Sequence, residues 1–160
     1  MNNHVVRYSH KILKEKRLVL EVLQGDFAIS TLKVNRDILY ADRLYNPHFD
    51  LLHDIREARM NFTLEEHTAY LNYLGKEAKV FTQRKAAILT IESTLAKYSE
   101  WFGTFNGLYD VEFKVFSSLG KCLEWINPDL IEMEIANEIE KLRTASCSQC
   151  FKEPNAFTGF

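Results

Sequence analysis

Residues 5–24, VVRYSHKILKEKRLVLEVLQ, decide the fold. They contain two strand-like runs, 5–13 and 17–24, separated by a short polar gap. The second run has an apolar face at period two, the spacing of a strand, formed by Leu18, Leu20 and Val22. Because the gap is short, we predict an antiparallel β-hairpin whose second strand ends at Gly25-Asp26.

Strand-like and helix-like segments alternate after the hairpin. We predict further strands at 49–55, 85–91 and 111–115, and helices at 30–43, 63–81, 93–102 and 117–126. This order predicts an α/β fold with a mixed sheet. The hairpin supplies an antiparallel edge, and right-handed crossovers make the remaining strands parallel.

Each predicted helix begins at a residue that can cap it. The candidate caps are Ser30 or Thr31, Thr63, Ser93 or Thr94, and Ser117 or Ser118. Thr63 and Glu66 have the spacing of a capping box. The helix after them has the clearest apolar face of the chain, formed by His67, Tyr70, Leu71, Leu74, Ala78 and Phe81.

The character of the chain changes after Pro128. We predict an α/β domain at 1–127, an appended amphipathic helix at 128–143 and a polar tail at 144–160. One face of this helix is apolar, formed by Ile131, Ile135, Ile139 and Leu142. These residues either pack back on their own domain or form a dimer or partner helix, and the sequence leaves both open.

Composition excludes several classes of protein. The chain has 160 residues, enough for one domain. Its net charge of -2 gives no general attraction to nucleic acid. Without an apolar run long enough for a membrane span or a signal peptide, we expect a cytoplasmic protein. Cys147 and Cys150 have CxxC spacing but no second pair, so we predict neither a disulfide framework nor a zinc site.

A string of short segments resembles the STAS domain, and more closely the bacterial SpoIIAA-like (STAS/SEC14-like) proteins. The similarity spans about residues 5–126, and the segments that carry it are LVL at 18–20 with Gly25, YNPHFDLL at 45–52, DIREA at 54–58, RKAAILT at 84–90, FKVFS at 113–117 and EWI at 124–126.

The resemblance implies a mixed sheet covered by helices, with roles in protein regulation or in nucleotide or lipid sensing. In the anti-sigma-factor antagonists of this family, a phosphorylated Ser follows the Asp that ends the third strand. The matching stretch here, 54–58, contains neither Ser nor Thr, so we do not expect that phosphorylation switch.

The end of the third strand is the candidate binding site, since ligands of open α/β sheets lie beyond strand ends. Asp54, Arg56 and Arg59 lie there, ahead of the helix start at Thr63. Arginine forks and free backbone N–H groups favour an anion. Alternatively, Asp54 and Arg56 pair with each other in a solvated loop.

A metal site is a weaker candidate than the anion site. Its possible ligands are two His and two Asp residues between 48 and 54: His48, Asp50, His53 and Asp54. On one strand Asp50 and Asp54 face one side and His53 the other. We therefore predict no metal and no cofactor.

No catalytic motif is present, so we predict a non-enzymatic interaction or regulatory module that binds a protein partner or a second copy of itself. The alternative is a carrier or sensor of a small apolar ligand such as a lipid, which the aromatic content of 12% favours. An enzyme that uses Asp54 and a nearby His is the weakest hypothesis.

Overall fold

The structure, a computed structural model, describes residues 5–76, 83–104, 106, 110–145 and 150–151. The strands are β1 (Val6–Leu13), β2 (Leu18–Phe27), β3 (Asp50–Met60), β4 (Arg84–Leu89), β5 (Val111–Phe116) and β6 (Cys150–Phe151). The helices are α1 (Ile29–Ala41), α2 (Leu64–Gly75), α3 (Glu92–Gly103), α4 (Leu119–Ile126) and α5 (Glu132–Thr144), and a 3₁₀ turn (Lys14–Lys16) joins β1 to β2.

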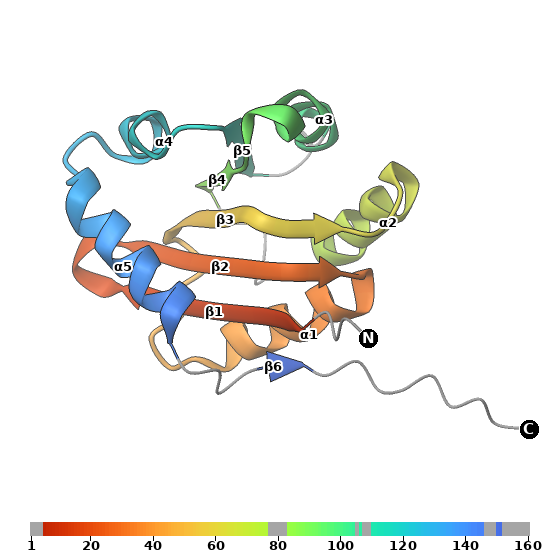
Figure 1. The fold of residues 1–160 in the computed structure, drawn as a ribbon, viewed down its shortest axis with the longest axis horizontal. Helices are drawn as coiled ribbons and strands as arrows, with labels where there is room; N and C mark the ends of the chain where they lie inside the picture. The colour runs from red at the N-terminus through yellow and green to blue at the C-terminus, as the bar shows by residue number, and fades with distance from the viewer. Residues whose placement is uncertain (1–4, 77–82, 105, 107–109, 146–149, 152–160) are drawn as a thin grey trace, which may run out of the picture.

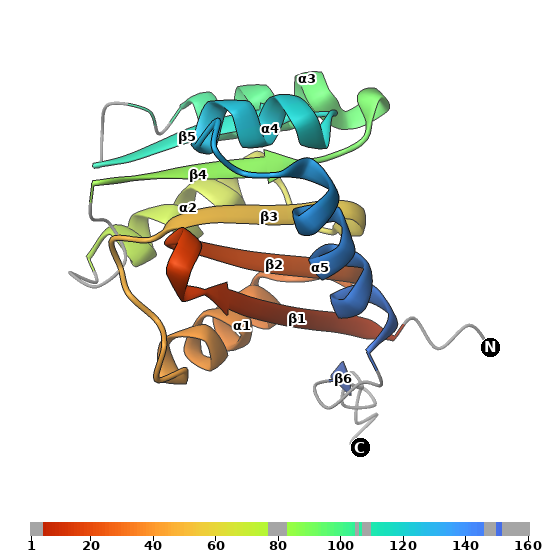
Figure 2. The ribbon, with the colours of Figure 1, turned by 90° about the vertical axis from the view of Figure 1, so that its left-hand side faces the viewer.

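The strands form one sheet in the order β5-β4-β3-β2-β1-β6. β1 and β2 are antiparallel, whereas β2, β3, β4 and β5 are parallel neighbours, so the predicted mixed sheet with an N-terminal hairpin is confirmed. Helices cover both faces: α4 and α5 lie on one side, and α1, α2 and α3 on the other (Figures 1 and 2).

The alternation of β2 assigns its side chains to these two faces. Leu18, Leu20 and Val22 pack with α4 and α5, as their shared periodicity predicted. The residues between them face the other way: Val19 belongs to the core beside α1 and α2. The sheet is therefore apolar on both sides, as expected for parallel strands covered by helices.

The predicted end of the second strand at Gly25-Asp26 is wrong. β2 continues to Phe27 in pairing with β3, and Gly25 within it has a positive φ of 99°, which an L side chain rarely adopts. The neighbouring strand continues with it: β3 extends to Met60, past the predicted end at Ile55, and Phe27 pairs with Met60.

Two predicted helix caps are also wrong. α1 begins one residue before Ser30, with Ala28 at its N-cap, and α3 begins at Glu92 with Ile91 at its N-cap. Neither N-cap makes a side-chain hydrogen bond. The capping box of α2 and the Ser118 cap of α4 are confirmed. Ala78 and Phe81 lie outside the described residues.

α5 packs back on its own sheet. Ile135 and Ile139 are 0% and 2% exposed in the core formed with α4. At its margins, Lys11 Nζ and Lys16 Nζ lie 2.6 Å and 3.0 Å from carboxylate oxygens of Glu138 and Glu134. The helix predicted as an appendage is thus part of this core.

The edge of the outer strand β5 that does not pair with β4 makes one further contact. The side-chain amide of Asn106 accepts from the Phe113 N–H at 2.8 Å and donates to the Phe113 carbonyl at 2.9 Å. It therefore bonds both backbone groups as a neighbouring strand would.

We expect Gly25→Ala to lower the free energy of unfolding by at least about 1–2 kcal/mol, the strain of a left-handed residue with a side chain. A Cβ at this position would also lie 2.7 Å from the Val5 carbonyl oxygen. Gly103→Ala is the matched control, since nothing lies within 4 Å of its added Cβ. Urea unfolding of both variants measures the difference, and equal stabilities would contradict the prediction.

Candidate functional site

A cavity of about 110 Å³ lies between the sheet and helices α1, α2 and α3. Its walls are mainly apolar, with Leu23 of β2 below and Leu32 of α1, Tyr70 of α2 and Trp101 of α3 around it. The capping box fixes the start of α2 and so helps to place Tyr70, Leu71 and Leu74 on the inner side.

A buried carboxylate lies behind this cavity. Glu21, in the middle of β2, is 0% exposed. It accepts a hydrogen bond from the Tyr8 hydroxyl at 2.7 Å, lies 2.5 Å from His53 Nδ1 and forms an ion pair with Arg36 of α1. These three partners come from β1, β3 and α1, so the cluster joins all four elements.

The pKa shifts in this cluster keep Glu21, Arg36 and Tyr8 each in one protonation state at neutral pH. Burial alone would raise the pKa of Glu21, but Arg36 and His53 outweigh it and hold the pKa well below the ordinary value. Burial likewise opposes the charge of Arg36, and Glu21 more than restores it, which raises the pKa of the guanidinium. Burial and the Glu21 charge raise the pKa of Tyr8. Glu21 is therefore ionised and Tyr8 protonated at neutral pH.

Besides Tyr70, Tyr98 and Trp101, the polar side chains that line the cavity are arginines and histidines. They are Arg36, His53, His67 and Arg84. Arg84, at the start of β4, is 6% exposed, and its Nη1 donates to the Tyr45 hydroxyl at 3.2 Å. No Asp or Glu is among the described residues that line the cavity.

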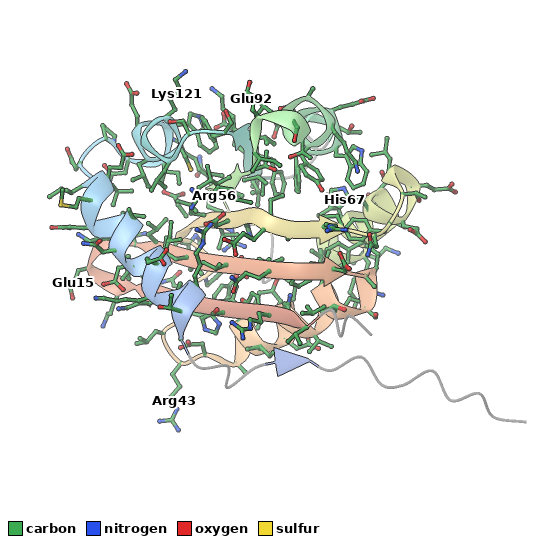
Figure 3. All side chains as sticks on the ribbon, viewed as in Figure 1. Glu15, Arg43, Arg56, His67, Glu92 and Lys121 are labelled. Carbon is green, nitrogen blue, oxygen red and sulfur yellow. The ribbon has the colours of Figure 1, made fainter. Side chains whose placement is uncertain are left out.

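His67 belongs to an aromatic cluster at the end of the cavity beside α2 (Figure 3). Its ring centroid lies 5.9 Å from that of Phe62, 5.2 Å from that of Trp101 and 4.9 Å from that of Phe102. Burial lowers the pKa of His67 to about 4. The imidazole is consequently neutral at pH 7.

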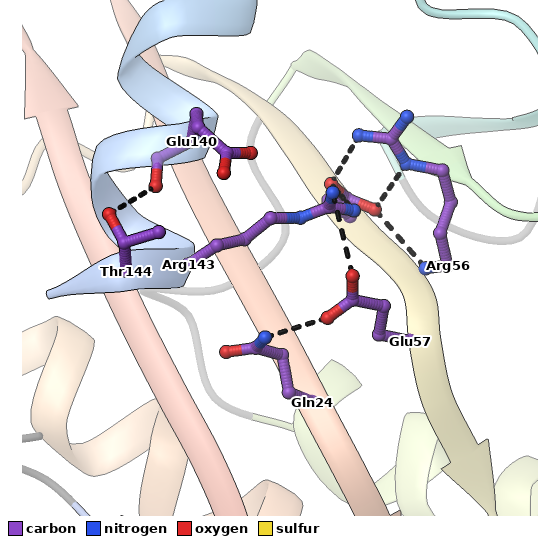
Figure 4. A network of polar contacts seen from close by, with 7 residues as sticks. Gln24, Arg56, Glu57, Glu140, Arg143 and Thr144 are labelled. Atoms are coloured by element: carbon purple, nitrogen blue, oxygen red, sulfur yellow. Dashed lines mark hydrogen bonds and ion pairs between the residues drawn. The ribbon is translucent and has the colours of Figure 1, made fainter.

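A second buried carboxylate, Asp54, lies on the opposite face of the sheet, where it contacts Arg143 of α5. It belongs to the polar network of Arg56, Glu57 and Arg143 that Figure 4 shows. It is 1% exposed and accepts from Arg56 Nε at 2.9 Å and Arg56 Nη2 at 2.7 Å. Arg143 Nη2 of α5 donates to the same carboxylate at 3.3 Å. Glu57 then lies 3.5 Å from Arg143 Nη1 and accepts from Gln24 at 2.7 Å. The cluster joins α5 to β3.

The four residues predicted as an anion site do not come together. Asp54 and Arg56 pair with each other, as the alternative predicted, but on a strand and with Asp54 buried instead of in a solvated loop. The side chain of Arg59 is 79% exposed and lies 3.8 Å from Asp26, while Thr63 caps α2. The reason is that β3 continues through these positions as a strand instead of ending in a loop at Ile55.

The apolar face of the predicted partner helix also packs against its own domain. Ile135 and Ile139 are buried against the sheet, and Leu142 packs at the edge of the same core. A partner can reach Ile131, which is 55% exposed.

The residues considered for a metal are dispersed. His53 contacts Glu21 on one face, Asp54 contacts Arg143 on the other, and Asp50 accepts from the Lys85 backbone N–H at 2.8 Å. Across the described residues there is no group of three or more His, Cys, Asp or Glu side chains that could hold a metal ion. Cys147 and the side chain of Cys150 lie outside what is described.

Sequence reasoning missed Glu21, Arg36 and Arg84. A signal existed for the first, because Glu21 is the one charged residue in the apolar run 18–23. Arg84 similarly stands at the head of a buried strand. Arg36 lies on a helix whose inner face is not sharply apolar, and no pattern marked it.

Comparison with known proteins identifies the fold. No family model matches the chain, and no curated protein matches it. Among solved structures, it is similar to an uncharacterized protein of the DUF3478 family with a SpoIIAA-like fold from Shewanella loihica PV-4, with a TM-score of 0.52 and 18% sequence identity. The match covers 79% of this chain and 97% of that one. The expected STAS/SpoIIAA-like fold is therefore confirmed.

Two physical limits bear on the expected ligands and partners. The cavity of about 110 Å³ is smaller than the roughly 300 Å³ at which ligand pockets begin, so it does not enclose a whole lipid. In the described part of the chain, no helix combines the length and apolarity that crossing a bilayer requires.

We expect the free energy of unfolding to fall as the pH is lowered from 6.5 towards 4, because the unfolded chain then binds a proton at His67 that the folded chain does not. A lowered pKa of this size corresponds to about 3 kcal/mol over that window. His67→Phe should flatten this part of the stability profile, measured by urea unfolding at several pH values. The exposed His48→Phe is the control, and an unchanged slope in His67→Phe would refute the assignment.

Proposed function

We propose that the chain is a non-enzymatic regulatory module that acts by binding. The observation that carries this proposal is the pairing of the two buried carboxylates: Glu21 contacts Tyr8, Arg36 and His53, and Asp54 contacts Arg56 and Arg143. The resolved pKa shifts agree with it, since each moves its group away from neutrality. The pKa of Glu21 is lowered, that of His67 is about 4 and that of Cys122 is about 12. Catalytic acids, bases and nucleophiles need a pKa near the working pH. The SpoIIAA-like fold is consistent with this proposal.

The cavity beside α1, α2 and α3 is the site where we place a ligand. Apolar walls with a few fixed polar groups are typical of small-molecule sites. The Glu21 cluster supports this placement because it anchors Arg36 and His53 at the cavity from behind. The volume restricts the ligand to a small molecule, which narrows the sequence-based alternative, a carrier or sensor of a small apolar ligand such as a lipid, by excluding a whole lipid.

Filling the cavity should abolish binding without unfolding the protein. Leu32→Phe adds volume from α1 at the cavity wall, whereas Val34→Phe makes the same kind of change at a position of this helix that is 40% exposed. Native mass spectrometry of wild-type protein, purified without detergent, should show extra mass that disappears on denaturation. We expect Leu32→Phe to lose this mass and Val34→Phe to keep it; bare wild-type chains would count against a ligand.

A second copy of the chain is the partner we propose for α5. Ile131 and Met133 at its start are 55% and 73% exposed, larger fractions than other apolar side chains of the described residues reach. Exposed apolar surface is a candidate contact for another chain. The buried positions of the helix are excluded from this contact.

The double variant Ile131→Ser, Met133→Ser should therefore shift a dimer towards monomer in sedimentation analysis, with unfolding stability unchanged. Ile91→Ser is the control, because Ile91 is 46% exposed but lies at the start of α3. A wild-type monomer at high concentration, or a dimer that the double variant retains, would exclude this surface.

A further inference from the structure

The polar lining of the cavity is one-sided. Two arginines and two histidines reach it, and the described lining residues include no carboxylate. The nearby carboxylate, Glu21, is fully buried behind them and already engages Tyr8, Arg36 and His53. A molecule that enters therefore meets the guanidinium side chains of Arg36 and Arg84, whose N–H groups bind acceptors and anions, beside the neutral imidazole of His67 and the side chains of Tyr70 and Tyr98.

Arg36 is the donor best placed to hold an anion. Its side chain is 13% exposed and lines the cavity, and Glu21 holds the guanidinium from the β2 side. A guanidinium carries several N–H donors in a rigid plane and can bind more than one acceptor. The hydrogen bond from Arg36 to Glu21 is donated by Nη2, and the other N–H groups of the guanidinium can bind a second carboxylate.

The remaining lining limits the body of the ligand. A cavity of roughly 150 Å³ with apolar walls accommodates benzene. The present volume of about 110 Å³ is somewhat smaller, but the cavity is partly open to solvent, so a ligand need not be fully enclosed; its walls include the rings of Phe62, Trp101 and Phe102. Offset or edge contacts with these rings favour a flat or compact apolar group.

We propose that the cavity binds a small organic monocarboxylate, with the carboxylate at Arg36 and an apolar body no larger than one six-membered ring against the aromatic wall. This inference rests on the proposed function, which places a ligand in the cavity, and adds the charge and size of that ligand. The acceptor end meets donors that Glu21 already holds in place, so little reorganisation accompanies binding.

Three compounds of nearly equal shape test the charge: benzoate, benzyl alcohol and benzylammonium. Each is titrated into the full-length wild-type chain after denaturation and refolding have removed any co-purified molecule, and binding is followed by NMR chemical shifts. We expect benzoate to bind at least about tenfold more tightly than benzyl alcohol, as charge-assisted hydrogen bonds are stronger than neutral ones. We expect no binding of benzylammonium.

Variants test the position. Arg36→Lys keeps a positive charge beside the buried Glu21 but loses the planar guanidinium. It should weaken the binding of benzoate several-fold and leave the affinity for benzyl alcohol unchanged. Arg59→Lys, at a side chain that is 79% exposed, is the control and should bind benzoate like the wild type. Thermal unfolding verifies that both variants fold.

The outcomes separate this inference from the proposed function. If benzyl alcohol binds as tightly as benzoate, the inference is overturned. If the Leu32→Phe variant then no longer binds benzyl alcohol, that result still supports a ligand in the cavity. If none of the three compounds binds, the inference is overturned. The proposed ligand site fails as well if the native protein also carries no extra mass.

Discussion

The position of one buried carboxylate determines much of this structure. Glu21 has no exposed surface, and an unpaired carboxylate there would be destabilising by several kcal/mol. Tyr8, Arg36 and His53 must therefore reach it together, which sets the placement of β1, α1 and β3 relative to β2. The same requirement places Arg36 and His53 at the cavity, so the folding constraint and the proposed binding surface are one arrangement.

The two faces of the sheet repeat this principle with different results. His53 and Asp54 are neighbours on β3, yet one contacts the Glu21 cluster beneath α1 and the other holds Arg143 of α5. On the α5 side, Asp54 is matched by Arg56 and Arg143, and the apolar core is closed around Ile135. On the α1 side a cavity remains. A ligand in this cavity would adjoin His53, and the next residue of β3, Asp54, holds Arg143 of α5.

The predictable parts of the fold are those set by local chemistry. Alternation at Leu18, Leu20 and Val22 and the Thr63 capping box depend on a few adjacent residues, and both are confirmed. The errors have a tertiary origin: β3 continues past Ile55 because β2 continues past Gly25, and a pairing partner is invisible in the sequence of either strand alone. For the candidate site the same holds more strongly. Arg36 and Glu21 are brought together by the packing of α1 on the sheet, which the sequence of neither segment reveals. The predicted anion site assumed a loop at positions that the extended strand occupies.

The outer strands of the sheet also carry a consequence. Exposed strand edges are templates on which other chains can add, and proteins commonly block them. Here the amide of Asn106 bonds both backbone groups of Phe113 on β5, and the two residues of β6 pair with Val6 and Arg7 on β1. A foreign strand would have to displace these contacts first. At these points the sheet is protected against growth by strands of other chains, the first step of uncontrolled polymerisation.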